Sequence, residues 1–381
     1  MKIGIDYAAT VGNGGNSVYS QNLINALIAA DQLNDYYLYA FAHDVLRGKL
    51  TALEHNKRVH LRPAYFSSLG VPLPSFVVEW LNYVSFRIWT AIDNLDIFHF
   101  TNPIYYQKGT YRKLIISIHD LGSLYNSNWS KKQSGNFFKK KIEEMVTRAD
   151  KIVAVSEYTQ KDILQNFKIH PNKIEVIYEA AGAVYYPETS KQELKDKFSI
   201  SDYLLYVGQI QPRKNIVNII LAYSQLPNEL RAKHPLVMVG SARERGYAET
   251  VNLIIVEYGL SSNVYMLGRV EDELLRKLYS GAKAFVFPSL FEGFGLPVLE
   301  ALQCGTPVIT SNTTSLPEVA GEAGVLVDPA DINDISQAMK NILVDDSFRD
   351  NLRDHCLSQA KKFSWGKAAI ETLLLYKSLH S

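Results

Sequence analysis

The sequence predicts an α/β protein with two doubly wound domains, each built on a largely parallel sheet. Short apolar runs alternate with segments of helical periodicity along the whole chain, and this alternation builds parallel sheets covered by helices on both faces. The length of 381 residues also exceeds one ordinary hydrophobic core. Both observations favour two domains of similar construction.

Composition limits the classes of function. The chain is 47% hydrophobic and 21% charged, as expected of a globular protein, and its net charge of +1 argues against a dedicated nucleic-acid binder. The two cysteines, Cys304 and Cys356, form neither a metal-binding pattern nor a disulfide framework. Residues 1–6 predict a strand rather than a signal peptide, and the apolar segment 76–89 is too short to span a bilayer. We therefore expect a cytoplasmic location.

The first domain begins with a strand at residues 2–6, a glycine-rich loop at 11–17 and a helix to about residue 30. The loop glycines lack the G-x-G-x-x-G spacing, so no NAD site is predicted. The loop is either a flexible turn or a place where a ligand approaches the backbone. Further strands are expected at 37–42, 58–61, 97–100, 114–118, 152–155 and 174–177.

His119 and Asp120 directly follow the predicted strand 114–118. Ligands of such sheets bind beyond the carboxyl ends of the strands, on loops that carry functional residues. These two residues are therefore the polar site candidates of the first domain.

A basic and aromatic stretch at residues 129–148 predicts a helix. It suits an anionic membrane surface and an ordinary solvated helix face equally well. Residues 80–89 raise the same question, and there core packing is favoured. The residues that give the first stretch its character are Lys131, Lys132, Phe137, Phe138, Lys139, Lys140 and Lys141.

The pattern breaks around residues 185–190, and a new series of strands follows a charged helix. The predicted organisation is a first domain at 1–185, a second at 186–363, and a final helix at 364–381 that returns to the first domain. The second series of strands is expected at 203–207, 236–239, 264–267, 284–287, 308–310 and 325–327.

The loop after the strand 203–207 begins at Gly208 and carries the adjacent cations Arg213 and Lys214. Arginine binds an anion by a fork and lysine as a point charge, so together they can neutralise a diphosphate. Val270 precedes a helix where backbone groups can meet a nucleobase. Residues 315–318 have capping-box spacing and predict only a helix start.

Residues 285–305 predict a buried strand, a glycine loop and a short helix with Pro297 in its first turn. The amides of residues 293–295 and the helix dipole can hold a phosphate. Glu292 and Glu300 would repel that phosphate, but carboxylates accept hydrogen bonds from hydroxyl groups well. A ligand with phosphate in its middle and hydroxyls at both ends is a nucleotide sugar.

In combination, these segments resemble the retaining glycosyltransferases of family 4 over most of the chain. The matching segments are 119–120, 155–157, 212–215, 288–289, 293–297, 305–308 and 363–365, together with Glu292 and Glu300.

This resemblance implies a GT-B fold, in which two Rossmann-like domains face a cleft. It implies that Arg213 and Lys214 bind the donor diphosphate, that Glu292 holds donor-sugar hydroxyls and Glu300 the ribose hydroxyls, and that His119 contacts the transferred sugar from the opposite domain. The other substrate-binding residues predicted are Gly14, Gly15, Asp120, Gly208, Val270, Ser289, Gly293, Phe294, Gly295 and Leu296.

The reaction implied is transfer of a sugar with retention, in which cations and helix amides stabilise the departing phosphate. The sequence contains no Asp-x-Asp motif, so no cofactor and no metal are expected. Gln209 stands where many family members have an arginine, which leaves Arg213 and Lys214 to hold the phosphates.

The motifs look most like bacterial mannosyltransferases that use GDP-mannose in O-antigen or other surface polysaccharide synthesis. The expected partners are a nucleotide sugar, a glycan or lipid-linked glycan acceptor and an anionic membrane at the inner face of the cell membrane, without nucleic acid. Three alternatives remain open: a UDP-sugar transferase, a nucleotide-sugar epimerase of similar architecture, and a non-catalytic binding module.

Overall fold

The computed structural model describes residues 1–11, 14–46, 50, 55–66, 74–125, 135–188, 194, 201–242 and 245–380. Two compact units make up the chain: unit 1 contains Met1–Glu179 and Trp365–Ser381, and unit 2 contains Ala180–Ser364. The sequence had placed the borders after residues 185 and 363. The first border lies earlier because Tyr185 packs on Tyr279, at 5.8 Å between ring centroids, and Gln303 donates to the carbonyl of Gly182.

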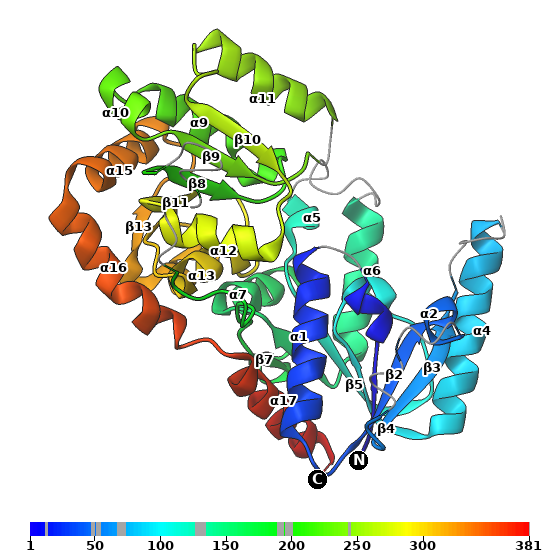
Figure 1. The fold of residues 1–381 in the computed structure, drawn as a ribbon. Coiled ribbons are helices and arrows are strands. Elements are labelled where there is room, and N and C mark those ends of the chain that lie inside the picture. The colour runs from blue at the N-terminus through cyan, green and yellow to red at the C-terminus, as the bar shows by residue number, and fades with distance from the viewer. Residues whose placement is uncertain are drawn as a thin grey trace. The chain divides into compact units, whose positions relative to one another are not determined.

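Unit 1 contains a seven-stranded sheet in the order β3-β2-β1-β4-β5-β6-β7, and each neighbouring pair is parallel (Figure 1). All seven strands were predicted, with ends that differ by a few residues. The strands are β1 (Lys2–Ile5), β2 (Asp35–Phe41), β3 (Val59–Tyr65), β4 (Leu95–Phe100), β5 (Tyr111–Ile118), β6 (Lys151–Ala154) and β7 (Ile174–Val176).

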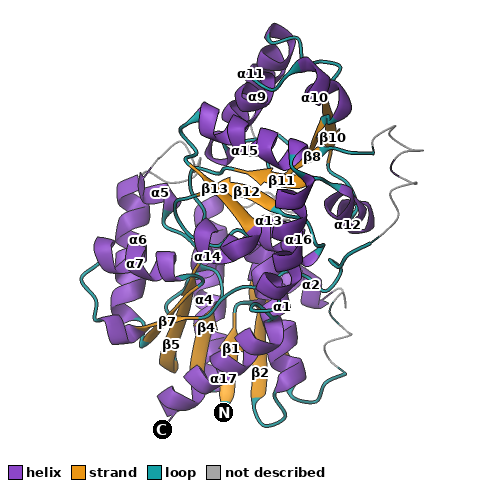
Figure 2. Ribbon diagram, turned by 90° about the vertical axis from the view of Figure 1, so that its left-hand side faces the viewer, coloured by secondary structure: helices purple, strands orange, loops and turns teal. Residues whose placement is uncertain are grey.

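The helices of unit 1 include the final helix α17, which lies beside α1 (Figure 2). The helices are α1 (Gly15–Ala30), α2 (Ala42–Leu46), α4 (Ser75–Asp93), α5 (Gly122–Tyr125), α6 (Gly135–Arg148), α7 (Glu157–Asn166) and α17 (Trp365–His380), with short 3₁₀ helices at Tyr7–Thr10, Pro103–Tyr105 and Pro171–Lys173. Their packing on the sheet buries an apolar cluster that includes Phe86, Phe98 and Ile116.

Unit 2 contains a six-stranded parallel sheet in the order β10-β9-β8-β11-β12-β13. The strands are β8 (Leu204–Val207), β9 (Leu236–Val239), β10 (Val264–Gly268), β11 (Ala284–Phe287), β12 (Val308–Ser311) and β13 (Gly324–Val327). Every residue of β8 and β11 is buried, which explains why these central strands read as unbroken apolar runs.

The helices of unit 2 are α9 (Ile216–Ser224), α10 (Asn228–Lys233), α11 (Arg245–Glu257), α12 (Asp272–Gly281), α13 (Leu296–Gln303), α14 (Leu316–Ala320), α15 (Ile332–Val344) and α16 (Asp346–Ala360), with 3₁₀ helices at Pro212–Lys214 and Gly321–Ala323. The helices α9 to α14 lie between successive strands, and α15 and α16 follow the last strand, β13. The fold class predicted from the sequence, two doubly wound parallel sheets with a final helix that returns to the first domain, is confirmed.

The strand order reverses once in each sheet, between β1 and β4 in unit 1 and between β8 and β11 in unit 2. Loops that follow neighbouring strands diverge at such a point and leave a crevice beyond the carboxyl ends of the strands, where α/β proteins bind their ligands. Each unit therefore has one preferred place for a ligand.

Residues 129–148 and 80–89 were the two stretches considered for contact with a membrane. Residues 129–134 lie outside the described residues, as do the side chains of Phe137 and Phe138, whereas Lys139 and Lys140 on α6 are exposed. Core packing was favoured for residues 80–89, and this prediction is wrong for Trp80, which is 61% exposed on α4. Among the described helices, none combines the length and apolar character needed to cross a membrane.

Candidate active site

The central reversal of the unit 2 sheet brings together four of the predicted residues. Arg213 and Lys214 belong to the 3₁₀ helix that follows β8, while Ser289 and Glu292 lie in the loop that follows β11. Because β8 and β11 are hydrogen-bonded neighbours, residues some 80 positions apart in sequence come into contact.

The Glu292 carboxylate lies at the centre of this group. Lys214 Nζ donates to Oε1 at 2.5 Å and the Ser289 hydroxyl donates to the same oxygen at 2.6 Å. Arg213 Nη1 donates to Oε2 at 3.2 Å and to the carbonyl of Phe291 at 2.6 Å. The Glu292 side chain is 9% exposed and that of Lys214 is 10% exposed, so these contacts form largely away from water.

The charge balance of this group favours an anionic ligand. Burial alone would raise the pKa of Glu292, but the charges of Arg213 and Lys214 outweigh it and hold the pKa below its ordinary value. Glu292 is therefore a carboxylate at neutral pH. Among these three side chains, two cations and one carboxylate leave a net charge of +1.

The main chain around this group is fixed by two polar side chains. Asn215 has a left-handed backbone (φ 62°), and its amide donates to the carbonyls of Pro288 at 2.9 Å and Pro329 at 2.7 Å. The Ser315 hydroxyl donates to the carbonyls of Glu292 at 3.0 Å and Phe294 at 2.8 Å.

The helix start predicted at residues 315–318 is confirmed, because α14 begins directly after Ser315. The Ser315 side chain makes no capping hydrogen bond to that helix, since its hydroxyl donates to the glycine loop instead.

The glycine loop leads into α13. Gly295, at the N-cap position, has a φ of 111°, and a Cβ there would lie 2.7 Å from the Leu316 side chain, so glycine is required. Gly293 and Phe294 are buried, and the Phe294 ring packs on Phe363 at 5.6 Å. Through residues 293–296 a ligand would therefore meet main-chain amides of the α13 N-terminus rather than the Phe294 ring.

Glu300 lies on α13 in a different environment. Its Oε2 accepts a hydrogen bond from the Tyr279 hydroxyl at 2.9 Å. Burial raises the pKa of Glu300 to about 7 and Asp272 adds to the rise, although the Tyr279 hydrogen bond acts in the opposite direction. Glu300 can therefore gain or lose its proton near neutral pH.

Two further predicted residues lie at strand ends of unit 2. Gly208 has a φ of 155°, its N–H donates to the carbonyl of Val239 at 2.9 Å, and a Cβ there would lie 2.7 Å from the Tyr206 hydroxyl. Val270 is half-buried and immediately precedes Glu271, the N-cap residue of α12.

In unit 1 the predicted residues cluster at the carboxyl ends of β1, β4 and β5. Gly14 and Gly15 begin α1, and Tyr19, about one turn further along, packs edge-on against the His119 ring at 4.6 Å between centroids. Gly14 is exposed, and a Cβ on it would meet no atom within 4 Å. Asp120 accepts a hydrogen bond from the Gly122 N–H at 3.0 Å, which stabilises the turn after His119.

Both ring nitrogens of His119 contact other residues of unit 1. Nε2 lies 2.8 Å from the carbonyl of Thr101, and Nδ1 lies 3.0 Å from Oε1 of Glu179. Burial alone would lower the pKa of His119, but Glu179 and the Thr101 carbonyl favour the charged ring and raise the pKa above its ordinary value. The side chain is therefore held by the protein on both sides.

Sequence reasoning missed three residues of this cluster: Glu179, Thr101 and Asp6. Asp6 accepts hydrogen bonds from the Thr101 N–H at 2.6 Å and hydroxyl at 2.7 Å. In the structure Asp6 directly follows β1, Thr101 directly follows β4, and Glu179 lies shortly after β7. The predicted first strand included Asp6, so its place at a strand end could be seen only in the structure. The position rule that singled out His119 applies to Thr101 and Glu179 too.

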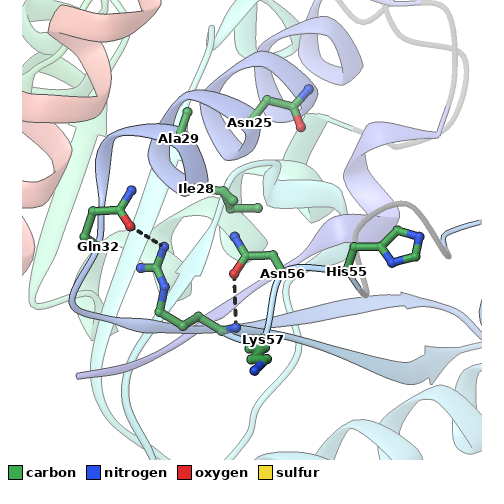
Figure 3. A pocket seen from close by; sticks show the side chains of 8 residues that line it. Asn25, Ile28, Ala29, Gln32, His55, Asn56 and Lys57 are labelled. Atoms are coloured by element: carbon green, nitrogen blue, oxygen red, sulfur yellow. Dashed lines mark hydrogen bonds between the residues drawn. The ribbon is translucent and has the colours of Figure 1, made fainter.

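A separate hollow of about 640 Å³ lies over the C-terminal half of α1 and the segment before β3 (Figure 3). Its lining includes Asn25, Lys57 and Arg58 and contains none of the predicted site residues. It lies at the amino ends of the strands, the opposite edge from that used by α/β proteins for ligands.

In the described part of the chain no group of acidic, histidine or cysteine side chains could hold a metal ion.

Comparison with known families agrees with the two-unit organisation. The model described as "Glycosyltransferase Family 4" matches residues 13–180, and the model "Glycosyl transferases group 1" matches residues 188–363. Among solved structures, sucrose-phosphate synthase from Thermosynechococcus elongatus has a TM-score of 0.79 at 22% identity, with 99% of this chain and 98% of that chain covered. HepE of Anabaena, in complex with UDP and glucose, has a TM-score of 0.75 at 18% identity, with 99% of each chain covered. These similarities support the fold.

Curated relatives are more similar in sequence. O-antigen chain mannosyltransferase B of Escherichia coli is 36% identical over 299 residues, which cover 77% of each chain. The serotype-specific mannosyltransferase WbdA of Escherichia coli is 37% identical over 265 residues, which cover 68% of this chain and 32% of WbdA. The chain thus belongs to the glycosyltransferases that join a family 4 domain to a group 1 domain, and it is a glycosyltransferase.

Proposed function

We propose that this enzyme transfers mannose from GDP-mannose, with retention, to a hydroxyl of a lipid-linked glycan in the synthesis of O-antigen or another surface polysaccharide. The observation that carries a nucleotide-sugar donor is the Arg213–Glu292–Lys214 group at the reversal of the unit 2 sheet. The choice of mannose is supported by the mannosyltransferase relatives at 36% and 37% identity.

The donor fits this group by charge and by hydrogen bonding. Arg213 and Lys214 would neutralise the diphosphate, with the amides of residues 293–296 at the α13 N-terminus as further donors. Glu292, held ionised, would accept hydrogen bonds from hydroxyls of the sugar. Glu300 would accept them from the ribose, at the other end of the diphosphate.

The reaction would break the bond between the anomeric carbon and the diphosphate as the acceptor oxygen approaches the same face of the sugar. The departing phosphate would take the proton of the acceptor hydroxyl. Negative charge develops on the phosphate, and fixed cations and amides that already face it lower the barrier without reorganisation. This chemistry assigns no step to a metal, so full turnover is expected with a chelator present.

The donor is tested by incubation of the full chain with GDP-mannose, UDP-glucose or UDP-N-acetylglucosamine, each with chelator. Release of nucleotide, by transfer or by slow hydrolysis, is expected with GDP-mannose. Turnover of a UDP-sugar in its place would assign another donor. Loss of GDP-mannose turnover on chelation would contradict metal independence.

The same incubations distinguish a transferase from two other functions, a nucleotide-sugar epimerase and a non-catalytic binding module. A nucleotide-sugar epimerase would convert the donor into a second nucleotide sugar without release of nucleotide. A binding module would bind the nucleotide in calorimetry without any turnover. In the transferase, Glu292→Ala abolishes most of the turnover, because Arg213 and Lys214 lose the carboxylate that fixes their positions.

Contact with an anionic membrane is the second part of the proposal. Phe76 and Trp80 on α4 are 70% and 61% exposed, and Lys139 and Lys140 on α6 are exposed as well. Burial lowers the pKa of Lys141 on α6, and the charge of Glu79 on α4 acts in the opposite direction, which indicates that these two side chains lie near one another. Aromatic rings and lysines together suit the boundary of an anionic bilayer.

Co-sedimentation with vesicles tests this contact. The full chain should sediment with vesicles that contain anionic phospholipid, less so with neutral vesicles, and Trp80→Ser should weaken the binding. Equal sedimentation of wild type and Trp80→Ser would exclude α4 from the contact. Leu253→Ser, at an exposed apolar position of α11 in unit 2, is the matched control.

A further inference from the structure

Glu179 lies at the end of unit 1, shortly after β7, and has no role assigned by any motif in the sequence. The Glu179 side chain is 6% exposed, and its Oε1 lies 3.0 Å from Nδ1 of His119. A carboxyl group so well removed from water is costly unless it is paired. His119 is a partner that can carry the opposite charge.

The other side of the His119 ring fixes its protonation. The carbonyl of Thr101 can only accept a hydrogen bond, so Nε2, at 2.8 Å, must carry a hydrogen. An Nδ1 that faces a carboxylate then carries one as well, which makes the ring an imidazolium. Asp6 in turn holds the main-chain N–H and the hydroxyl of Thr101, so the carbonyl that orients the ring is itself held in place.

We propose that Glu179 is a positioning residue of the transfer reaction, which acts through His119 by holding its ring in one orientation with both nitrogens protonated. This inference rests on the proposed function, because it assumes that His119 takes part in sugar transfer. Glu179 touches no substrate in this account. Its effect is the state of the His119 ring.

The other ionisable groups around His119 do not replace Glu179. Asp120 is adjacent and its charge favours the imidazolium, whereas His99 and His119 would repel one another if both were charged. Burial lowers the pKa of His99 to about 3, so that ring is neutral. Burial and the nearby carboxylates of Glu179 and Asp6 raise the pKa of Tyr19 above its ordinary value, so its ring is neutral too. Glu179 is therefore the carboxylate that most directly holds the charge on His119.

The test uses Glu179→Gln in the full chain, which keeps the size of the side chain and removes its charge. The pKa of His119 is followed by NMR of histidine-labelled protein, with the His119 signal assigned as the one absent from His119→Gln. We expect the pKa of His119 to fall in Glu179→Gln, because burial lowers this pKa and the negative charge of Glu179 that counteracts burial is then missing. Above both pKa values each unit of fall lowers the charged fraction about tenfold.

Activity should follow the charge of His119. In Glu179→Gln we expect kcat with GDP-mannose to fall, by about tenfold for each unit of pKa lost at pH values above both pKa values and by less at lower pH, with the alkaline limb of the pH–rate profile shifted to lower pH. The KM for the donor should stay unchanged, since the proposed nucleotide contacts lie in unit 2. Glu175→Gln is the matched control: it removes a β7 carboxylate that pairs with Lys151 at the surface, and wild-type kinetics are expected.

A double mutant separates positioning from a purely structural effect. If Glu179 acts through His119, then Glu179→Gln should lower kcat no further in a His119→Gln background. An additive loss, or an unchanged alkaline limb, would overturn the inference. A wild-type His119 pKa below 6.5 would do so as well, even if Glu179→Gln failed to fold. Absence of turnover by wild type with any nucleotide sugar would instead sink the proposed function, and the NMR titration would still report on the pair.

Discussion

The surroundings of Glu292 and of Glu300 differ although both residues lie in one strand–loop–helix stretch. The Glu292 carboxylate accepts hydrogen bonds from Lys214, Arg213 and Ser289, two of them cations. The Glu300 carboxyl group accepts one from the neutral hydroxyl of Tyr279 and lies near Asp272. The pKa of Glu292 is accordingly lowered, and that of Glu300 is raised to about 7.

This contrast separates two roles that the sequence treats alike. The environment of a carboxyl group sets its pKa and therefore its protonation state at neutral pH. Two carboxyl groups of one site whose pKa values differ commonly have different roles in a reaction. The lowered pKa keeps Glu292 ionised at neutral pH, and three side chains fix its position, which suits a group beside the reacting sugar. Glu300 can gain or lose its proton near neutral pH, so its hold on a ligand should depend on pH.

The largest effect on activity is expected from a substitution in the group of residues around Glu292. Lys214→Met should lower kcat with GDP-mannose by about 10²–10³-fold, as loss of one group that stabilises developing charge does in other enzymes. The change also removes a donor to Glu292. The measurement is steady-state release of nucleotide. Lys283→Met, which removes a lysine paired with Asp202 elsewhere in unit 2, should retain wild-type kcat; a similar loss there would show that the effect is not specific to the site.

The sequence predicted this region unevenly, and the reason is physical. Strand positions were readable because buried parallel strands are continuous apolar runs, as in Ala284–Phe287. Arg213, Lys214 and Glu292 were recognised as candidates, but their mutual contact follows from the adjacency of β8 and β11, which residue pattern alone does not encode.

Other features depend on long-range contacts and could not be predicted. Ser315 reads as a helix cap from its spacing, yet its hydroxyl donates to the glycine loop. His119 is predicted from the sequence only as a polar site candidate at a strand end, and the contacts of its two ring nitrogens with Thr101 and Glu179 are visible only in the structure. For both Ser315 and His119, the sequence pattern correctly predicted where the residue lies relative to its helix or strand. The hydrogen bonds of each side chain depend on residues distant in sequence.

Substitution of Glu300 should have a smaller effect, on the affinity for GDP, and this effect should depend on pH. Glu300→Gln should weaken GDP binding by about 10- to 100-fold at pH 8, since a hydrogen bond to a charged group contributes about 1.5–3 kcal/mol. In wild type, affinity should fall as the pH drops through about 7 and Glu300 gains its proton. Calorimetric titrations at pH 6, 7 and 8 check this; a pH dependence that persists in Glu300→Gln would assign it to another group.

Tyr279→Phe should shift this pH dependence without removing it. The Tyr279 hydrogen bond lowers the pKa of Glu300 against the effect of burial, so its loss should raise that pKa further. We expect the midpoint of GDP affinity to move to higher pH by up to about one unit, which corresponds to about 1.4 kcal/mol. The same titrations measure it, and Tyr265→Phe, at an exposed position on β10, should leave the midpoint unchanged.

The smallest effect concerns stability. A carboxyl group whose folded-state pKa is raised stabilises the fold below its unfolded-state value and loses that contribution as the pH rises through the folded-state value. For Glu300 this window runs from the ordinary value of 4.5 to about 7. Relative to wild type, the Tm of Glu300→Gln should therefore rise between pH 5 and 7.5, by about 2–4 °C for each kcal/mol involved. Asp6, whose pKa burial also raises to about 7, affects both proteins equally and cancels from the difference. A difference in Tm that stays constant with pH would show that Glu300 ionises as readily in the folded chain as in the unfolded one, and the contrast with Glu292 would then be lost.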